Sequence, residues 1–146
     1  MNLPALRTAL LVLLASPMAL AETAEPAVAF AADDPGLAWG PCPEFMPEGC
    51  QISVLNGDPA GPASDVFFKV PGGAVIPHHW HTSSERMVLV SGELQVSYDG
   101  HQARTLRTGM YAYGPARLGH SAICSAGDPC ILFISFSAPV DAVPTD

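Results

Sequence analysis

Turn signals divide this chain into short segments and leave little room for long helices. Asp99-Gly100 and Asn56-Gly57 are dipeptides typical of β-hairpin turns. Between such signals lie short runs of β-prone residues, at residues 51–55, 66–70, 86–90, 94–98, 111–113 and 130–136. Turns spaced roughly 8–12 residues apart, without helical periodicity longer than one turn, are typical of a β-sandwich or barrel. We therefore expect an all-β fold built as a single small antiparallel β-barrel.

Three of the five histidines fall within one short stretch, residues 73–92. His79 and His81 are two residues apart, so on an extended strand both rings leave the same face. Their Cα atoms would lie about 7 Å apart, which lets both imidazoles bind one ion at about 2.1 Å. After a short polar turn, Glu85 opens the next apolar run, where its carboxylate can return to the same point. Such a set of ligands suits a divalent transition metal.

A second stretch adds another histidine, and together the two stretches resemble the paired motifs of the cupin family. The first motif spaces its residues as Gly, five residues, His, one, His, three, Glu, six, Gly, and it matches Gly73, His79, His81, Glu85 and Gly92. The second spaces them as Gly, five residues, Pro, four, His, and it matches Gly109, Pro115 and His120. The resemblance covers roughly residues 50–140 and implies a jelly-roll fold, also described as a double-stranded β-helix.

The resemblance implies that His79, His81, Glu85 and His120 bind one divalent transition metal ion. Three imidazoles and one carboxylate suit Fe, Mn, Zn, Ni or Cu and do not choose among them. Enclosing these four polar groups in a barrel without an ion would leave several unpaired, at roughly 1–3 kcal/mol each. His78 should face the opposite side of the strand from His79.

The second motif departs from the family at two positions. The family often has Gly where this chain has Arg117, and Asn where this chain has Cys124; neither position is a metal ligand in the family. Arg117 and Tyr113 are our candidates for a catalytic side chain. Arg117 would either hold a substrate carboxylate in a bidentate grip or solvate its turn, and we favour the turn.

Strand alternation predicts which apolar residues surround this site. If His79 and His81 point inward, Met87, Leu89 and Ala122 should also point inward. Either Phe67 or Phe68 joins them, and the sequence does not say which. An apolar wall of this kind keeps a site dry and strengthens electrostatic effects within it.

Residues 1–21 are typical of a secretory signal peptide. Arg7 supplies a positive charge before the wholly apolar run 9–15, and Ala19-Leu20-Ala21 offers a small-x-small cleavage site. The apolar run is too short to span a bilayer, so we expect an exported protein, periplasmic or secreted, that is not inserted in the membrane after cleavage. The alternatives are an uncleaved anchor or a buried strand.

The mature chain then divides into two parts. Residues 22–36 are rich in Ala, Pro and acidic groups and are expected to form a flexible N-terminal linker. Residues 37–146 would form the cupin domain. Trp39, near its start, is expected to pack as an arm against the barrel edge, and the alternative is a stacking role in the pocket.

Four cysteines permit three disulfide pairings. Proximity in the sequence favours Cys42 with Cys50 and Cys124 with Cys130, and disulfides are typical of an oxidising compartment. In the alternative, Cys124 is a thiolate near the metal, because it lies an even number of residues beyond His120 and would share its face.

The charge of the chain excludes some classes of partner. Once Arg7 has left with the signal peptide, five Lys and Arg oppose 14 Asp and Glu, for a formal charge of −9 against −8 for the whole chain. This balance offers no electrostatic footprint for nucleic acid or an anionic membrane surface. A small organic molecule is the expected partner.

Three functions fit these observations. The first is a metal-dependent enzyme acting on a small organic molecule; we favour a dioxygenase, with isomerase or lyase chemistry as variants. The second is a non-catalytic protein that binds metal or a small ligand, and the third is a sensor cupin. Small cupins commonly pair their sheets, so the resemblance also leaves a homodimer open.

Overall fold

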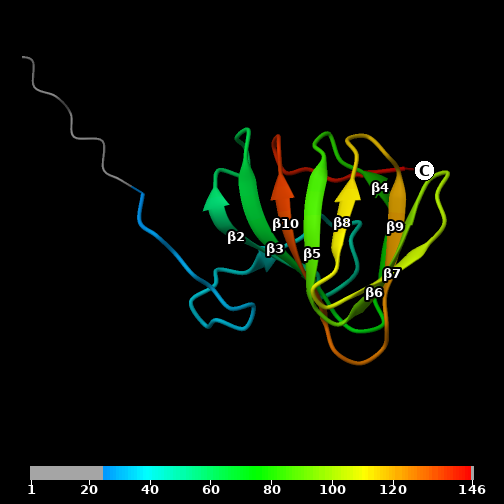
Figure 1. Cartoon of the computed structure of the whole chain (residues 1–146), viewed down its shortest axis with the longest axis horizontal. Coiled ribbons are helices and arrows are strands. Elements are labelled where there is room, and N and C mark those ends of the chain that lie inside the picture. Colours follow the sequence, from blue (N-terminus) through cyan, green and yellow to red (C-terminus); the bar gives the residue numbers. More distant parts are fainter. Residues whose placement is uncertain (1–24, 146) are drawn as a thin grey trace, which may run out of the picture.

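The computed structural model describes residues 25–145, which form two antiparallel β-sheets and contain no helix (Figure 1). The proposed signal peptide and its cleavage site therefore lie outside the described residues. One sheet has the order β1-β2-β3-β10-β5-β8, with bounds Gly40–Pro41, Gln51–Gly57, Ser64–Val70, Cys130–Phe136, Glu85–Ser91 and Tyr111–Gly114. The other has the order β11-β4-β9-β6-β7, with bounds Val143–Pro144, Val75–Trp80, His120–Cys124, Glu93–Tyr98 and Arg104–Arg107.

The two sheets enclose one hydrophobic core, as the alternation along β10 illustrates. Cys130, Leu132, Ile134 and Phe136 are all buried, and the residues between them are only half-buried. This period of two places every second side chain on the inner face of a strand. The inner faces of the two sheets meet in a core that includes Val66, Val70, Leu89, Leu94, Val96, Leu106 and Ala122. The predicted all-β, jelly-roll fold is confirmed.

The two predicted hairpin turns have different outcomes. Asp99-Gly100 joins β6 to β7, and Gly100 adopts a φ of 74°, which glycine reaches without steric cost. The prediction of a tight turn at Asn56-Gly57 is wrong. Gly57 is the last residue of β2, and the connection to β3 continues through residues 58–63. Asp58 stabilises that longer loop by accepting a hydrogen bond of 2.9 Å from the Ala60 amide.

A β-bulge in β4 sets the phase of the strand that carries two of the predicted ligands. Ile76 pairs with Ala122, but the next pair is His79 with His120, so three steps along β4 match two along β9. Pro77 lies within the bulge, where its lack of an N–H group breaks no ladder hydrogen bond. The bulge lets Ile76 and His79 both face the interior although they are an odd number of residues apart.

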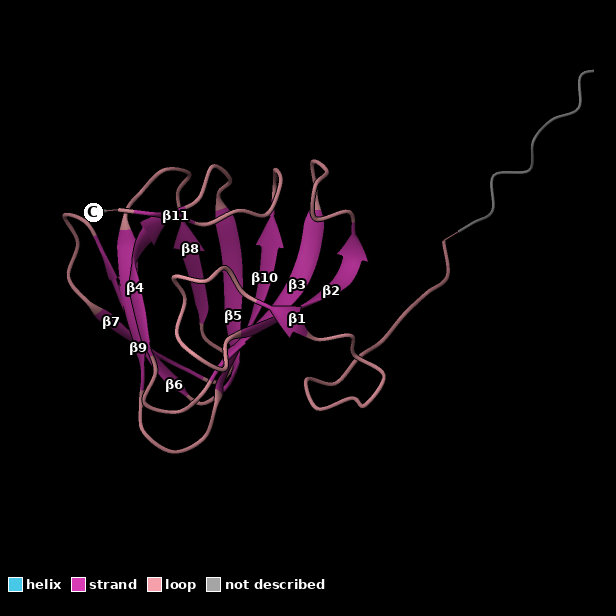
Figure 2. Cartoon of the chain, turned by 180° about the vertical axis from the view of Figure 1, so that it is seen from behind, coloured by secondary structure: helices cyan, strands magenta, loops and turns pink. Residues whose placement is uncertain are grey.

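Segments at both ends of the described chain pack on the sheets. Near the start, a disulfide joins Cys42 to Cys50, and the Lys69 ammonium lies 4.0 Å from the ring centroid of Trp39, which packs on the sheet as the sequence predicts. Near the end, β11 lies beside β4 (Figure 2). Within residues 25–145, the structure has no helix with the length and apolar character needed to cross a membrane.

Candidate metal centre

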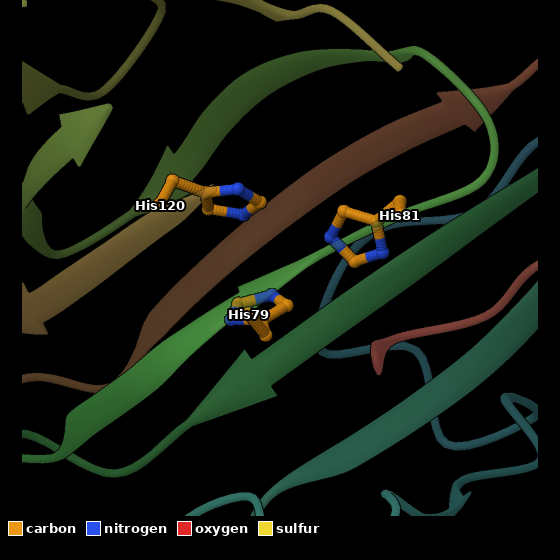
Figure 3. A group of neighbouring side chains, drawn as sticks. All are labelled: His79, His81 and His120. Atoms are coloured by element: carbon orange, nitrogen blue, oxygen red, sulfur yellow. The ribbon is translucent and has the colours of Figure 1, made fainter. Parts of the chain in front are cut away.

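Three histidine rings converge inside the fold, as Figure 3 shows. His79 in β4 pairs directly with His120, the first residue of β9, and His81 follows the end of β4. All three are buried, with 3, 8 and 7% of their surface exposed for His79, His81 and His120. One ring nitrogen from each lies within 4.8 Å of the other two. Because imidazole ligands lie about 2.1 Å from a metal, these three rings could hold one ion.

Glu85 reaches the same point from the opposite sheet. It is the first residue of β5, its surface is 3% exposed, and its carboxylate oxygens lie 3.5 Å from His81 Nε2 and 3.5 Å from His120 Nε2. Gly114 on β8 pairs with Glu85, and a Cβ atom at Gly114 would lie 2.6 Å from Glu85 Oε1. The absence of a side chain at Gly114 therefore makes room for the carboxylate. The structure brings together the four side chains that the sequence singles out as ligands.

Backbone carbonyls fix the orientation of the three rings. His79 Nδ1 donates to the Pro77 carbonyl at 2.7 Å, and His120 Nδ1 donates to the Leu118 carbonyl at 3.2 Å. His81 Nδ1 donates to the carbonyl of Asp141, just before β11. A neutral imidazole that donates through Nδ1 carries its lone pair on Nε2. The carbonyls thus select the tautomer that leaves Nε2 free to bind a metal.

Burial keeps two of these rings uncharged near neutral pH. It lowers the pKa of His79 from 6.5 to about 4, and it lowers the pKa of His120 to about 3. Burial also raises the pKa of Glu85, an effect that the charge of His81 and the hydrogen bond from Tyr98 partly offset. Since metals bind the neutral form of histidine, the two lowered pKa values favour the form of the ring that binds a metal.

Tyr98 is a residue of the site that our sequence reasoning missed. Its hydroxyl donates to Glu85 Oε1 at 3.3 Å, and its ring centroid lies 5.0 Å from that of His120. Burial raises its pKa, and the charge of Glu85 raises it further. One signal was present in the sequence, because Tyr98 continues the inward alternation of Leu94 and Val96 along β6.

A small apolar cavity of about 50 Å³ adjoins the ligands. Met87 and Ala122 line it as predicted, and Leu89 is fully buried nearby. Phe68 also lines it, whereas Phe67 packs edge-to-face on Phe133, with ring centroids 6.5 Å apart. Phe68, and not Phe67, is therefore the phenylalanine that points toward the site, a choice that the sequence left open. Apolar walls lower the local dielectric and strengthen electrostatic interactions at the site.

Neither Arg117 nor Tyr113 lines this cavity. The Arg117 guanidinium lies 5.7 Å from the ring centroid of Trp80, and its backbone N–H donates to the His81 carbonyl at 2.8 Å. Arg117 has a φ of 63°, which explains why the family often has glycine at this position. Tyr113 is 48% exposed on β8, with the Arg86 guanidinium 5.7 Å from its ring centroid.

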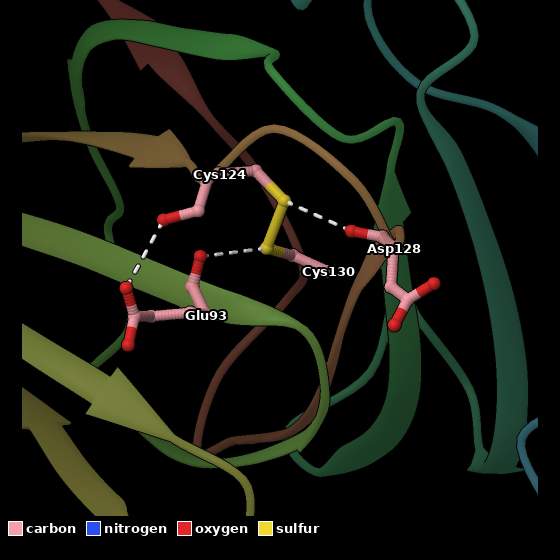
Figure 4. Close-up of a disulfide and its surroundings, with 5 residues drawn as sticks. Glu93, Cys124, Asp128 and Cys130 are labelled. Carbon is pink, nitrogen blue, oxygen red and sulfur yellow. Dashed lines mark hydrogen bonds between the residues drawn. A yellow bond between two sulfur atoms is a disulfide. The ribbon is translucent and has the colours of Figure 1, made fainter.

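The remaining candidate ligands lie outside the cluster. Cys124 is joined to Cys130 in a disulfide between β9 and β10, next to Glu93 and Asp128 (Figure 4). The alternative in which Cys124 is a thiolate is therefore wrong for this structure. Both disulfides join the cysteines that are closest in sequence. His78 faces away from the cluster, and its Nε2 lies 2.9 Å from Asp99 Oδ1.

The chain belongs to the cupin superfamily. The model of the cupin domain family matches residues 66–136, which run from β3 to the end of β10 and contain all four candidate ligands. The match agrees with the paired antiparallel sheets described above. Among curated proteins, none matches this chain significantly.

Solved structures with this fold include named enzymes. The DMSP lyase DddQ from Ruegeria pomeroyi DSS-3 aligns with a TM-score of 0.64 and 19% identity, over 75% of this chain and 61% of the lyase. An RmlC-like cupin from Shewanella frigidimarina NCIMB 400 aligns with a TM-score of 0.59 and 24% identity, over 72% of this chain and 86% of that protein. An oxalate oxidase aligns with a TM-score of 0.58 and 19% identity, over 68% of this chain and 57% of the oxidase. The chain spans less than two thirds of the lyase and of the oxidase, and these likenesses show the fold alone.

Proposed function

We propose that His79, His81, His120 and Glu85 together hold one divalent transition metal ion, which is Fe, Mn, Zn, Ni or Cu. The observation that carries this proposal is the convergence of three buried imidazoles, each oriented through Nδ1 by a backbone carbonyl. The Glu85 carboxylate lies 3.5 Å from Nε2 of two of them, His81 and His120. Their nitrogen and oxygen atoms are ligands of the type that these metals prefer.

The protein acts as an exported metal-dependent enzyme on a small organic molecule, with dioxygenase-like chemistry. Two disulfides support an oxidising compartment, and residues 1–21 are its signal peptide, followed by the linker at 22–36 and the cupin domain at 37–146. Neighbours of the same fold are named DMSP lyase and oxalate oxidase, which supports an enzyme without transferring either reaction. After cleavage of the signal peptide, the mature protein is a soluble periplasmic or secreted domain.

The side chains around the ligands have defined parts in this activity. When bound, the metal supplies Lewis-acid or redox chemistry at an open coordination position. The Tyr98 hydroxyl donates a hydrogen bond to Oε1 of the ligand Glu85, so Tyr98 can hold a proton beside the metal centre. Met87, Phe68 and their neighbours exclude water from the cavity. The same arrangement serves isomerase or lyase chemistry.

The second candidate is a non-catalytic metal-binding or sensor cupin. The size of the cavity favours it, because about 50 Å³ holds an ion and little more. Ligand pockets that enclose an organic molecule usually measure about 300–1,000 Å³. A protein that only stores or senses a metal needs no larger space beside the ligands.

Turnover by the metal-loaded protein separates the two candidates. Oxygen consumption is measured with catechol, flavonol and β-diketone compounds, and anaerobic product formation is measured with the same panel for isomerase or lyase activity. The double variant His79→Ala/His81→Ala is the control and should lose both metal and turnover. If the protein holds a full equivalent of metal but turns over no compound of the panel, the enzyme proposal is rejected in favour of a non-catalytic metal-binding protein.

A further inference from the structure

An open groove lies between the edge strands of the two sheets. It has a volume of about 800 Å³ and runs between β7, the edge of one sheet, and β8, the edge of the other. Its floor consists of inward-facing residues, among them Val96 and Leu106, and residues 101–103 of the connection between β6 and β7 also line it. Its volume is within the range of sites that bind small organic molecules.

This groove adjoins the candidate metal centre. Val96 and Tyr98 line both the groove and the small cavity beside the ligands. The Tyr98 hydroxyl reaches Glu85 Oε1, so this side chain stands between the two spaces. A molecule too large for the inner cavity can therefore occupy the groove with one end directed toward the metal centre.

The charge of the groove is opposite to that of the molecule. Acidic residues outnumber Lys and Arg by 14 to 6 in the chain, yet no Asp or Glu is among the described residues that line the groove. Arg104 lines it, is exposed, and takes part in none of the ion pairs found within residues 25–145. A guanidinium without a carboxylate partner is a ready site for an organic anion.

The walls of the groove are apolar and aromatic. Tyr111 and Tyr113 on β8 are 58% and 48% exposed, and Met110 beside them is 42% exposed. Large apolar side chains gathered at one opening are typical of a ligand site. Tyr111 and Tyr113 share the outer face of the sheet with Val88 and the exposed Arg86, so both tyrosines lie at the rim of the groove.

We propose that the groove between β7 and β8 binds a small aromatic carboxylate, with its carboxylate on Arg104 and its ring against Met110 and the apolar groove floor. The far end of the ligand points past Tyr98 toward the metal centre. This inference rests on the proposed function and names the substrate class of that same site. It also accounts for an inner cavity that is too small to hold an organic molecule.

Fluorine NMR with two matched probes tests the groove on the purified, metal-loaded protein. The probes are para-fluorobenzoate and its neutral isostere para-fluorobenzamide. The benzoate should bind at least about tenfold more tightly, because a charge-assisted hydrogen bond contributes more than a neutral one. The variant Arg104→Gln should weaken benzoate binding about tenfold and leave benzamide binding unchanged, and Arg104→Lys should retain part of the preference.

The control variant is Arg107→Gln, on the same strand but outside the groove, where Arg107 Nε pairs with Glu93 at 3.2 Å. It should bind both probes as the wild type does. In protein loaded with Mn(II), the fluorine signal of bound benzoate should also broaden, because the probe lies near the paramagnetic ion. Equal affinity for both probes, or an unchanged benzoate affinity in Arg104→Gln, would overturn the groove assignment.

Metal content, measured by elemental analysis, separates a failure of the groove from a failure of the proposed function. A protein that binds no metal contradicts the proposed function, and probe binding then still reports on the groove through the fluorine chemical shift. A protein that holds metal but shows no preference for benzoate refutes the groove alone.

Discussion

His79 and His120 combine burial with a fixed tautomer, and both properties prepare them to bind a metal. Each is less than a tenth exposed, and each donates through Nδ1 to a carbonyl two residues earlier in the chain. The ring cannot rotate without losing that hydrogen bond. The cost of protonating such a ring should be measurable in the stability of the metal-free protein.

The metal-free protein should lose stability as the pH falls from about 6.5 to about 4. The pKa of His79 is lowered to about 4, so across this window the unfolded chain binds a proton that the folded chain does not. Stability therefore falls with falling pH, by on the order of 3 kcal/mol for His79 alone. His120 acts in the same direction, and the raised pKa of Glu85 offsets part of the loss.

Urea unfolding at several pH values within this window measures the effect. The variant His79→Gln should show a shallower dependence on pH than the wild type. The control His101→Gln removes an exposed histidine and should keep the wild-type slope. Identical slopes in wild type and His79→Gln would contradict the assignment of a buried neutral imidazole.

Arg117 is the residue-scale feature that the backbone explains best. Its φ of 63° crowds Cβ against the backbone, a cost of roughly 1–2 kcal/mol that glycine avoids. Arg117→Gly and Arg117→Ala both lose the contact with Trp80, and only the glycine variant relieves the crowding. We expect Arg117→Gly to be about 1 kcal/mol more stable than Arg117→Ala, as measured by urea unfolding. The control Ala116→Gly, where φ is not positive, should destabilise; equal stability of the two Arg117 variants would refute the explanation.

At the scale of elements, the segment before β11 braces the turn that carries His81. The Asp141 carboxylate accepts hydrogen bonds from the Thr82 amide at 2.9 Å and the Thr82 hydroxyl at 2.7 Å. The Asp141 carbonyl accepts from His81 Nδ1. One residue of the C-terminal segment thus holds both the turn and a candidate ligand, and β11 adds its pairing with β4.

Removing the Asp141 carboxylate should loosen the metal centre. Asp141→Ala keeps the carbonyl that accepts from His81 Nδ1 and removes both hydrogen bonds to Thr82. Loss of a direct partner of a metal-binding histidine typically costs about 10–100-fold in metal affinity, so we expect this indirect loss to weaken metal binding by at most about tenfold. Asp141→Asn keeps an acceptor for one of the two hydrogen bonds to Thr82. Its metal affinity should therefore lie between those of Asp141→Ala and the wild type. Titration with Zn²⁺ measures the effect, with the exposed Asp33→Ala as control. An unchanged affinity in Asp141→Ala would mean that the turn holds His81 without the brace.

The sequence predicted elements and ligands better than it predicted their surroundings. Period-two alternation put His79 and His81 on one face. Glu85 and His120 joined them through the resemblance to the paired cupin motifs. Tyr98 was missed, because its contact with Glu85 depends on how the sheet that contains β6 packs on the sheet that contains β5, which no local pattern encodes. The strand at 104–107 was also missed, since two of its four residues are arginines and it reads as a polar turn.

At the scale of the whole molecule, the jelly-roll topology brings together candidate ligands that no single strand contains. The candidate ligands come from β4, its following turn, β5 and β9, which belong to two different sheets. Closing the two sheets over one core therefore assembles the metal centre, and unfolding disperses it. Metal binding and folding should be coupled for this reason.

X-ray absorption at the metal edge of the protein, loaded with one equivalent of Mn(II) or Fe(II), tests the convergence of these four side chains most directly. We predict one ion per chain, with a first shell of three imidazole nitrogens and at least one carboxylate oxygen. The variant His79→Ala should lose one imidazole from that shell or lose the ion altogether. A wild-type spectrum without multiple scattering from imidazole, or with a single histidine in the shell, would contradict the metal centre described above.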